Sequence, residues 1–356
     1  MQIRKVLRFN LLVGLVSFAA STSTVNAANA PVSFQGKTLT ILISSSPGGG
    51  TDTAGRLISQ FLPKYLPGNP VTVVQNMPGG GGTIANNHFY ANAKPDGLTL
   101  LQDSSSAIGN MNRGGPRIKY DHRKSRPIGS IARGGSILMV RKELKDSLTD
   151  MKSRKLVVGD TDGIRTWVSM TVWSAEYLNW NLRWLYGYKG SRELSLALRQ
   201  GEIDLWATSN ARLIADMRKE GGIELLYQQD EERRPDFRDV PTFKEFLGNK
   251  KPGGVSWDAY QAWANSEDLD KFLMAPAKTP DHIVAALREG FIRMNKDEDF
   301  KALATKFFGD SWALNSGEAT EAMIKKLTSI PKPAQDFLTQ IRKKYGLPVG
   351  GPAAES

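Results

Sequence analysis

Hydrophobic residues in the first third of the chain fall into two alternating patterns. Short apolar runs of strand length lie at 39–43, 70–75 and 98–101. Stretches with helical spacing follow the first two runs, and the first stretch has apolar residues at Ala54, Leu57, Ile58 and Phe61. Pro63 is expected to kink or end that helix. Strands and helices that alternate over tight connections predict an α/β fold with a parallel, doubly wound sheet.

Each of these three strands ends in a turn of small residues. The turns lie at 47–52, 76–83 and 103–106. We expect Thr51 or Asp52 to cap the helix after the first turn, and Thr83 to cap the helix after the second. A glycine turn before a helix favours an anion, because unpaired N–H groups and the positive dipole end point outward together.

The two glycine turns do not match the common phosphate motifs. A dinucleotide fingerprint would need a third glycine where the chain has Thr53. Gly36-Lys37-Thr38 resembles the end of a P-loop, but its leading position is Pro31 and it precedes the strand. The pattern therefore indicates an anion site that is not one of these nucleotide sites.

The second half of the chain continues the alternation. Further strands are predicted at 136–140, 156–159, 184–188 and 203–207, with helices at 167–177 and 191–199. The strand at 136–140 is the expected crossing into a second domain, and the return is expected between Tyr260 and Met274. A helical region follows Pro276, with apolar residues at Ile283, Leu287, Phe291 and Met294.

Composition and the N-terminus indicate an exported protein without disulfides. Residues 1–30 have the basic end, the apolar centre and the small-residue cleavage site of a signal peptide. The chain has no cysteine, which excludes disulfides, catalytic thiols and a lipid-anchored cysteine. The formal charge of +11 favours a small anionic ligand, and no stretch interleaves cations with aromatic residues as a nucleic-acid groove does.

Catalytic and metal-binding patterns find little support. The three histidines, His88, His122 and His282, lie far apart and lack metal-ligand spacing. Gly134-Gly135-Ser136 does not complete a nucleophile elbow, because Leu138 replaces the final glycine. We therefore expect no enzyme, no metal ion and no cofactor.

Several short motifs occur in an order that resembles one known family. They are 47–52 (PGGGTD), 76–83 (NMPGGGGT), 95–100 (PDGLTL), 187–190 (GYKG), 196–204 (LALRQGEID), 234–243 (RPDFRDVPTF) and 275–280 (APAKTP). The set is similar to the Bug family of extracytoplasmic solute-binding proteins, the receptors of tripartite tricarboxylate transporters. The resemblance implies a two-lobed type II periplasmic binding protein, each lobe a doubly wound sheet flanked by helices. It places lobe I at 31–135 plus 261–356, lobe II at 136–260, and a ligand cleft between them.

The resemblance also implies a set of ligand-binding residues. One carboxylate of an organic acid would be held at the first turns, by Ser46, Gly49, Thr51, Asp52, Gly80, Gly81, Thr83 and Ser105. The other end of the ligand would face lobe II, through Asp160, Arg165, Thr166, Tyr188, Ser191, Asp204 and Thr208.

Two of these residues have alternative roles. The charge of Asp52 would repel a carboxylate, which favours a helix cap or a water anchor over direct contact. The loop 160–166 departs from the glycine and serine that the family usually has there. Arg165 either pairs with a ligand carboxylate or is a surface partner of Asp160 or Asp162.

The expected function is therefore that of a periplasmic, monomeric receptor. It would capture an organic carboxylate (a di-, tri- or aromatic acid) and deliver it to membrane transporter subunits, without nucleic acid as a partner. The alternative is a sensor that presents its closed, ligand-bound form to a membrane kinase.

Overall fold

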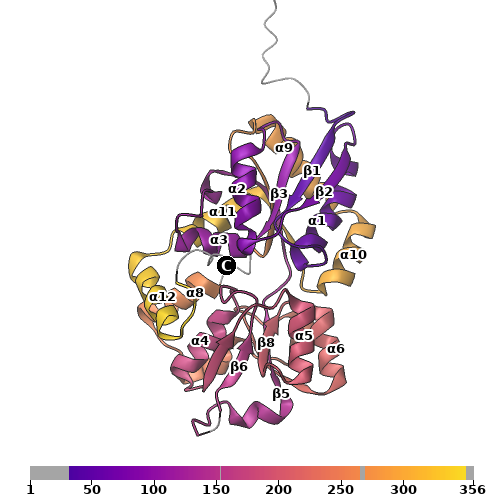
Figure 1. Cartoon of the computed structure of the whole chain (residues 1–356). Helices are drawn as coiled ribbons and strands as arrows, with labels where there is room; N and C mark the ends of the chain where they lie inside the picture. Colours follow the sequence, from indigo (N-terminus) through magenta and orange to yellow (C-terminus); the bar gives the residue numbers. More distant parts are fainter. Residues whose placement is uncertain (1–31, 153, 265–268, 350–356) are drawn as a thin grey trace, which may run out of the picture. The chain divides into compact units, whose positions relative to one another are not determined.

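The computed structural model describes residues 32–349 except 153 and 265–268, so the predicted signal peptide lies outside the described residues. Two mixed β-sheets organise this part of the chain (Figure 1). The first sheet has the order β11-β4-β10-β3-β1-β2. Its strands are β1 (Thr38–Ile43), β2 (Val71–Asn76), β3 (Thr99–Ser104), β4 (Arg126–Ala132), β10 (Lys271–Ala275) and β11 (Ala313–Ser316).

The first three strands confirm the parallel prediction. β1 pairs in parallel with β2 and with β3, so that Ile41 lies opposite Val74 and Leu100. The rest of the sheet differs, because β10 is antiparallel to both β3 and β4, and β11 is antiparallel to β4. The sheet is therefore mixed, since a strand from the C-terminal part of the chain inserts between β3 and β4 in the opposite direction.

Two hydrophobic clusters cover the two faces of this sheet. Ile41 and Ile43 belong to one cluster, whereas Leu42 belongs to the other, as the alternation of side chains along a strand requires. Helices α1 and α10 lie side by side on the first face (Figure 1), with the rings of Phe61 and Phe300 5.6 Å apart. The helices packed around this sheet are α1 (Gly50–Phe61), α2 (Thr83–Asn92), α3 (Ser105–Arg113), α9 (Asp281–Met294), α10 (Glu298–Phe308) and α11 (Gly317–Thr328).

Pro63 ends α1 as predicted. The α-helix stops at Phe61, and a 3-10 turn covers Leu62–Tyr65. A proline cannot donate the hydrogen bond that would continue the helix. The turn packs against α9 and directs the chain toward β2.

The second sheet has the order β7-β6-β8-β5-β9. Its strands are β5 (Ile137–Arg141), β6 (Leu156–Gly159), β7 (Leu182–Leu185), β8 (Leu205–Thr208) and β9 (Ile223–Gln228). β6 is parallel to β7 and β8, whereas β5 is antiparallel to β8 and β9. The helices of this region are α4 (Val168–Tyr177), α5 (Ser191–Gln200), α6 (Ala211–Glu220), α7 (Phe243–Leu247), α8 (Gly254–Ala264) and α12 (Lys332–Lys344).

In the described residues the chain passes from the first sheet to the second and back. It leaves the first sheet after β4, enters the second at β5, and is back in the first at β10. Helix α12 differs from the prediction, which kept all of 261–356 with lobe I. Ala334, Ile341 and Leu347 join the hydrophobic cluster of the second sheet, where α12 packs on α8.

None of the helices in the described part of the chain is both long and apolar enough to cross a membrane.

Candidate functional site

The turns after β1, β2 and β3 lie at one edge of the first sheet. β1 lies between β2 and β3, and all three run in the same direction. Their carboxyl ends therefore meet, and ligands of open α/β sheets bind at that edge. The predicted residues gathered there are Ser46, Gly49, Thr51, Asp52, Gly80, Gly81, Thr83 and Ser105.

Helix α1 begins directly behind the first turn. Its N-cap residue is Gly49, and no side chain caps it. The prediction that Thr51 or Asp52 caps this helix is therefore wrong, because both residues lie inside its first turn and are buried. Ser46 is exposed on the turn itself. The amide groups at the start of α1 are left for other partners, as at any helix N-terminus without a cap.

Asp52 connects the first turn to the end of β2. Its carboxylate accepts hydrogen bonds from the N–H of Gly48 at 2.8 Å and from Nδ2 of Asn76 at 2.8 Å. Arg56 adds an ion pair at 2.9 Å. Burial raises the pKa of Asp52, but these bonds outweigh it and hold the pKa below its ordinary value. Asp52 is a charged residue that orders the turn.

Arg133, which follows β4, brings a guanidinium group to the start of α1. A Cβ atom at Gly50 would lie 2.6 Å from its Nη1. Arg133 donates to the carboxylate of Asp270, from Nη2 at 3.0 Å and from Nε, and Lys271 also bonds that carboxylate. Burial raises the pKa of Asp270, but Arg133 and Lys271 lower it to about 2. The Arg133 guanidinium therefore lies at the N-terminus of α1, where a positive group favours an anion.

The second turn, Gly79–Gly82, requires glycine throughout. Its φ angles are 124°, 57°, 60° and 94°, all in the region that residues with a Cβ rarely adopt. Within the described part of the chain, the N–H groups of Gly80 and Gly81 have no hydrogen-bond acceptor. Nδ2 of Asn110 donates to the carbonyl oxygens of the same two residues, at 3.2 and 3.1 Å. Asn110 holds the carbonyl groups, and the N–H groups are left for a ligand.

Thr83 does not cap α2, contrary to the prediction. The N-cap residue is Gly82, again without a side-chain bond, and Thr83 is the first residue of the helix. Its buried hydroxyl accepts a 3.4 Å hydrogen bond from Asn110 instead. Ser105 is likewise the first residue of a helix, α3, and its N–H bonds the carbonyl oxygen of Asp270 at 2.8 Å.

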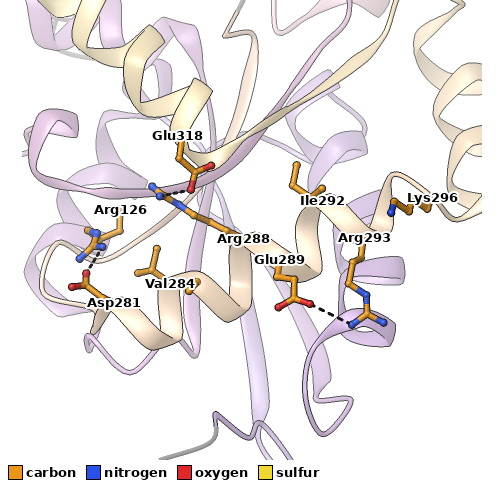
Figure 2. A pocket seen from close by; sticks show the side chains of 10 residues that line it. Arg126, Asp281, Val284, Arg288, Glu289, Ile292, Arg293, Lys296 and Glu318 are labelled. Carbon is orange, nitrogen blue, oxygen red and sulfur yellow. Dashed lines mark hydrogen bonds and ion pairs between the residues drawn. The ribbon is translucent and has the colours of Figure 1, made fainter. Parts of the chain in front are cut away.

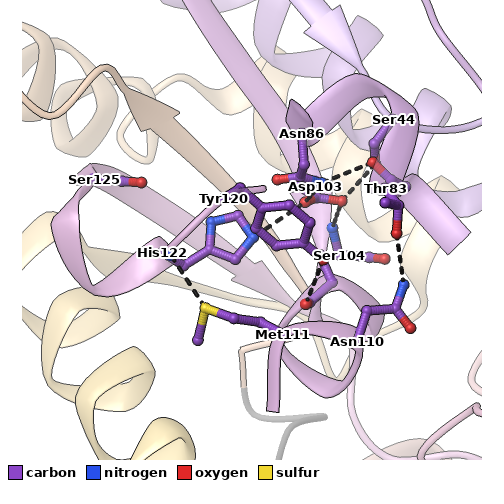
Figure 3. A network of polar contacts seen from close by, with 12 residues as sticks. Ser44, Thr83, Asn86, Asp103, Ser104, Asn110, Met111, Tyr120, His122 and Ser125 are labelled. Carbon is purple, nitrogen blue, oxygen red and sulfur yellow. Dashed lines mark hydrogen bonds and ion pairs between the residues drawn. The ribbon is translucent and has the colours of Figure 1, made fainter. Parts of the chain in front are cut away.

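A buried polar network supports the second turn (Figure 3). The carboxylate of Asp103 accepts hydrogen bonds from Oγ of Ser44 at 2.5 Å and from Nδ2 of Asn86 at 2.6 Å. Asn86 also donates to the carbonyl oxygen of Gly82 at 2.9 Å. Asp103 thus joins the end of β1 to the turn that precedes α2.

Burial shifts the pKa values of Asp103 and His122 toward their uncharged forms. Burial raises the pKa of Asp103 to about 6, although its hydrogen bonds from Ser44 and Asn86 lower it. The Nε2 atom of His122 lies 3.6 Å from Asp103, and burial lowers the pKa of this histidine to about 3. At neutral pH His122 is therefore uncharged, and the donors around Asp103 hold its carboxylate without an ion pair from His122.

The loop after β6 meets the second turn. A Cβ atom at Gly81 would lie 3.3 Å from Cδ1 of Ile164, so the two segments are in contact range. Asp160 is buried and accepts a hydrogen bond from the N–H of Gly163 at 2.8 Å. Burial and the charge of Asp162 raise the pKa of Asp160 to about 7. The structure therefore brings a loop of the second sheet to the glycine turn of the first.

Arg165 and Thr166 lie in the same loop. The Arg165 side chain is 41% exposed, with its Nε 3.8 Å from Asp162 and 3.1 Å from the hydroxyl of Thr161. Of the two roles that the sequence left open for Arg165, these contacts favour a surface partner of Asp162 over a partner of a ligand carboxylate. Thr166 is buried, and its carbonyl oxygen accepts a hydrogen bond from Ser169 at 2.6 Å.

Four other predicted residues belong to the second sheet and its connections, and they do not form one group. Thr208 ends β8 on the same edge as the loop after β6, and Ser191 is the exposed first residue of α5. The hydroxyl of Tyr188 donates to Glu202 at 2.7 Å. Asp204 precedes β8, at the opposite edge of the sheet from Thr208, and is buried between Arg154 and the N–H of Val157. The structure does not bring Asp204 together with the glycine turns.

Several residues of this region were not predicted. They are Asp103, Asn110, Arg113, Arg133, Tyr186, Asp270, Lys271 and Arg342. Only Asp103 had a usable signal, as a carboxylate in the run that ends an apolar strand. Asn110, Arg133 and Arg342 reach the region through partners far away in the sequence.

A separate groove runs along α9 (Figure 2). Its volume is about 580 Å³. Four of its charged residues pair with each other, Arg126 with Asp281 at 2.6 Å and Arg288 with Glu318 at 2.8 Å. Because Arg126 and Arg288 already have carboxylate partners and Glu289 lines the same groove, we place the candidate anion site at the glycine turns.

Comparison with known proteins assigns the fold to a family. The sequence model described as "Tripartite tricarboxylate transporter family receptor" matches residues 56–329, more than half of the chain. The chain belongs to this family of receptors. The predictions of family and of a solute-binding receptor that is not an enzyme are therefore confirmed.

A curated relative matches the receptor over a limited length. Protein BugT of Bordetella pertussis is 33% identical over 96 residues, which is 27% of this chain and 28% of BugT. The chain thus spans little more than a quarter of the length of this relative.

Solved structures resemble the receptor over most of its length. The periplasmic binding protein BugD has a TM-score of 0.63 at 20% identity, over 87% of this chain and 98% of BugD. MatC of Rhodopseudomonas palustris, solved with malate, has a TM-score of 0.61 at 21% identity, over 82% and 96% of the two chains. A second R. palustris protein, solved with adipate, has a TM-score of 0.64 at 20% identity, over 87% and 97%. These similarities confirm the periplasmic binding protein fold.

Proposed function

We propose that this receptor works in the periplasm, where it captures an organic carboxylate and delivers it to the membrane subunits of a tripartite tricarboxylate-type transporter. The ligand class comprises di-, tri- and aromatic carboxylic acids. Membership in the receptor family and the malate and adipate of two structural neighbours support this class. The predicted signal peptide at 1–30 supports the compartment.

The observation that carries the proposal is the second glycine turn. The N–H groups of Gly80 and Gly81 have no acceptor in the described part of the chain, and α2 starts directly behind them. Oriented N–H groups at a helix N-terminus bind a carboxylate without a cationic side chain. The guanidinium group of Arg133 lies at the N-terminus of α1, where a positive group is compatible with a bound anion.

A thermal-shift series tests the proposal. Purified mature protein is heated with malate, adipate, citrate or benzoate, and with glucose as an uncharged control. A ligand at one hundred times its Kd stabilises the native state by about 2.7 kcal/mol, which raises the Tm measurably. We expect a shift with at least one acid, confirmed by calorimetric titration. No shift with any acid at millimolar concentration would contradict a carboxylate receptor.

A further inference from the structure

Two guanidinium groups, one buried and one half-buried, lie near the loop after β6. Arg342 of α12 is 4% exposed, donates to the carbonyl oxygens of Gly163 at 2.8 Å and Pro348 at 2.7 Å, and lies 4.2 Å above the ring of Trp263. Arg113 is the last residue of α3, and it bonds the side chain of Asn110. Asn110 in turn holds the second glycine turn, so Arg113 is linked to the proposed carboxylate site.

The loop residue Gly163 lies between Arg342 and Tyr186. Gly163 has a φ of 70°, and a Cβ atom there would lie 2.7 Å from the ring of Tyr186. The same residue accepts the hydrogen bond from Arg342 through its carbonyl oxygen. Tyr186 and Arg342 thus both lie against Gly163.

The charges here are poorly compensated. Burial lowers the pKa of Arg113 to about 10. Burial, and then repulsion from Arg113, lower the pKa of Arg342 to about 9. The charge of Asp162 raises the pKa of Arg113, of Arg342 and of Tyr186, so all three groups lie within the electrostatic range of this carboxylate. Neither arginine forms an ion pair with Asp162 within 4.0 Å in the described residues.

Two donor atoms in the region have no acceptor. Nε of Arg113 and the hydroxyl of Tyr186 are buried and have no hydrogen-bond partner among the described residues. Burial raises the pKa of Tyr186, so the hydroxyl keeps its proton and can donate. A buried donor without an acceptor is costly, and an anion supplies acceptors for both atoms.

We propose that Arg113, Arg342 and Tyr186 form a second anion subsite, which binds the far carboxylate of a dicarboxylic acid whose first carboxylate lies at the second glycine turn. This assignment rests on the proposed function and specifies its ligand class as a diacid. The sequence analysis gave Arg165 as one candidate partner of a ligand carboxylate. We assign that pairing to Arg113 and Arg342 instead, because Arg165 is 41% exposed and its Nε bonds Thr161 within its own loop.

Calorimetric titration with adipate and with its monoacid analogue hexanoate tests the subsite. The variants are Arg113→Gln and Tyr186→Phe, with Arg212→Gln as a control, because Arg212 is 73% exposed on α6. We expect each of the two subsite variants to lose about ten- to hundredfold in adipate affinity, the range of a hydrogen bond to a charged group. Hexanoate should bind wild type and variants alike, and Arg212→Gln should bind adipate as wild type does.

Tyr186→Phe separates recognition from structure. The hydroxyl has no partner in the described residues, so its removal breaks no bond and the Tm without ligand should stay unchanged. Loss of adipate affinity at an unchanged Tm supports the subsite. Equal adipate affinity in wild type and both variants overturns it, as does an equal loss for hexanoate. A hundredfold loss in Arg165→Gln with none in Arg113→Gln also overturns it. Wild type that binds hexanoate but not adipate refutes the diacid subsite alone, whereas binding of none of the tested acids refutes the proposed function as well.

Discussion

Alanine substitutions at Gly81 and Gly49 should change stability to very different extents. Gly81 has φ 60° and ψ 33°, the left-handed conformation that costs an L-residue about 1–2 kcal/mol. A Cβ atom there would also lie 2.9 Å from Nδ2 of Asn110, closer than a carbon and a nitrogen can approach. The side chain of Asn110 would have to move away from the turn.

The displacement of Asn110 adds to the cost at Gly81. Its Nδ2 donates to the carbonyl oxygens of Gly80 at 3.2 Å and of Gly81 at 3.1 Å. Each such bond contributes about 0.5–1.5 kcal/mol. Together with the backbone strain, Gly81→Ala should destabilise the protein by about 2–5 kcal/mol.

Gly49 is the matched control in the first turn. Its φ of −80° and ψ of 166° are open to any residue, and the nearest atom to an added Cβ is the carbonyl oxygen of Ser46 at 3.6 Å. Gly49→Ala should therefore change stability by less than about 1 kcal/mol, because the lower entropy of the unfolded chain is offset by the poor preference of alanine for the N-cap position.

Urea unfolding followed by tryptophan fluorescence measures both variants, since the chain has 8 tryptophans. The two midpoints should move apart with similar m-values. Equal midpoints for the two variants, or a loss of more than about 1 kcal/mol in Gly49→Ala, would contradict a left-handed backbone at Gly81 and an extended backbone at Gly49.

Two further substitutions probe charges near the site. Asp103→Ala leaves Ser44 and Asn86 without their buried acceptor and should cost about 2–4 kcal/mol in urea unfolding; a loss below 1 kcal/mol would contradict the network. Because the pKa of Asp160 is raised by burial to about 7, its contribution to stability is full below pH 3.8 and is lost as the pH rises through 7. Asp160→Asn keeps an acceptor for Gly163, and its stability relative to wild type should improve from pH 5 to pH 8 by on the order of 2 kcal/mol; no change over this range would contradict the raised pKa.

The parts of the fold that the sequence predicted depend on local patterns. The short apolar runs that became β1, β2 and β3 and the helical spacing of α1 are patterns that neighbouring residues determine. Helix α3 was missed because its sequence, SSAIGNMNR, is rich in weak helix formers. Its first N–H is held by the carbonyl oxygen of Asp270, a contact that no local pattern contains.

The sequence predicted the glycine turns of the candidate site but not the charged side chains around them. Glycine turns are visible in sequence, but their conformations are not, since Gly49 is extended and Gly81 is left-handed. The cations come from distant segments. Arg133 and its partner Asp270 are 137 residues apart, and Arg342 and Gly163 are 179 apart. Periodicity reports which face of an element is buried, and it contains no information about which distant charge lies against it.

The second glycine turn contacts the loop after β6. A ligand that bonds both segments should therefore stabilise this contact more than a ligand that bonds the turn alone. A ligand shifts a conformational equilibrium only by its difference in affinity between the two states. A monoacid that bonds only Gly80 and Gly81 touches one segment and has little preference for the arrangement in which Ile164 approaches Gly81. A diacid that also bonds Arg342, which is fixed on the loop through Gly163, gains that contact only in this arrangement. Under the proposed subsite, the diacid should therefore stabilise the joined state by the contribution of Arg342 and Tyr186, whereas its contact with Arg113 on α3 does not require the loop.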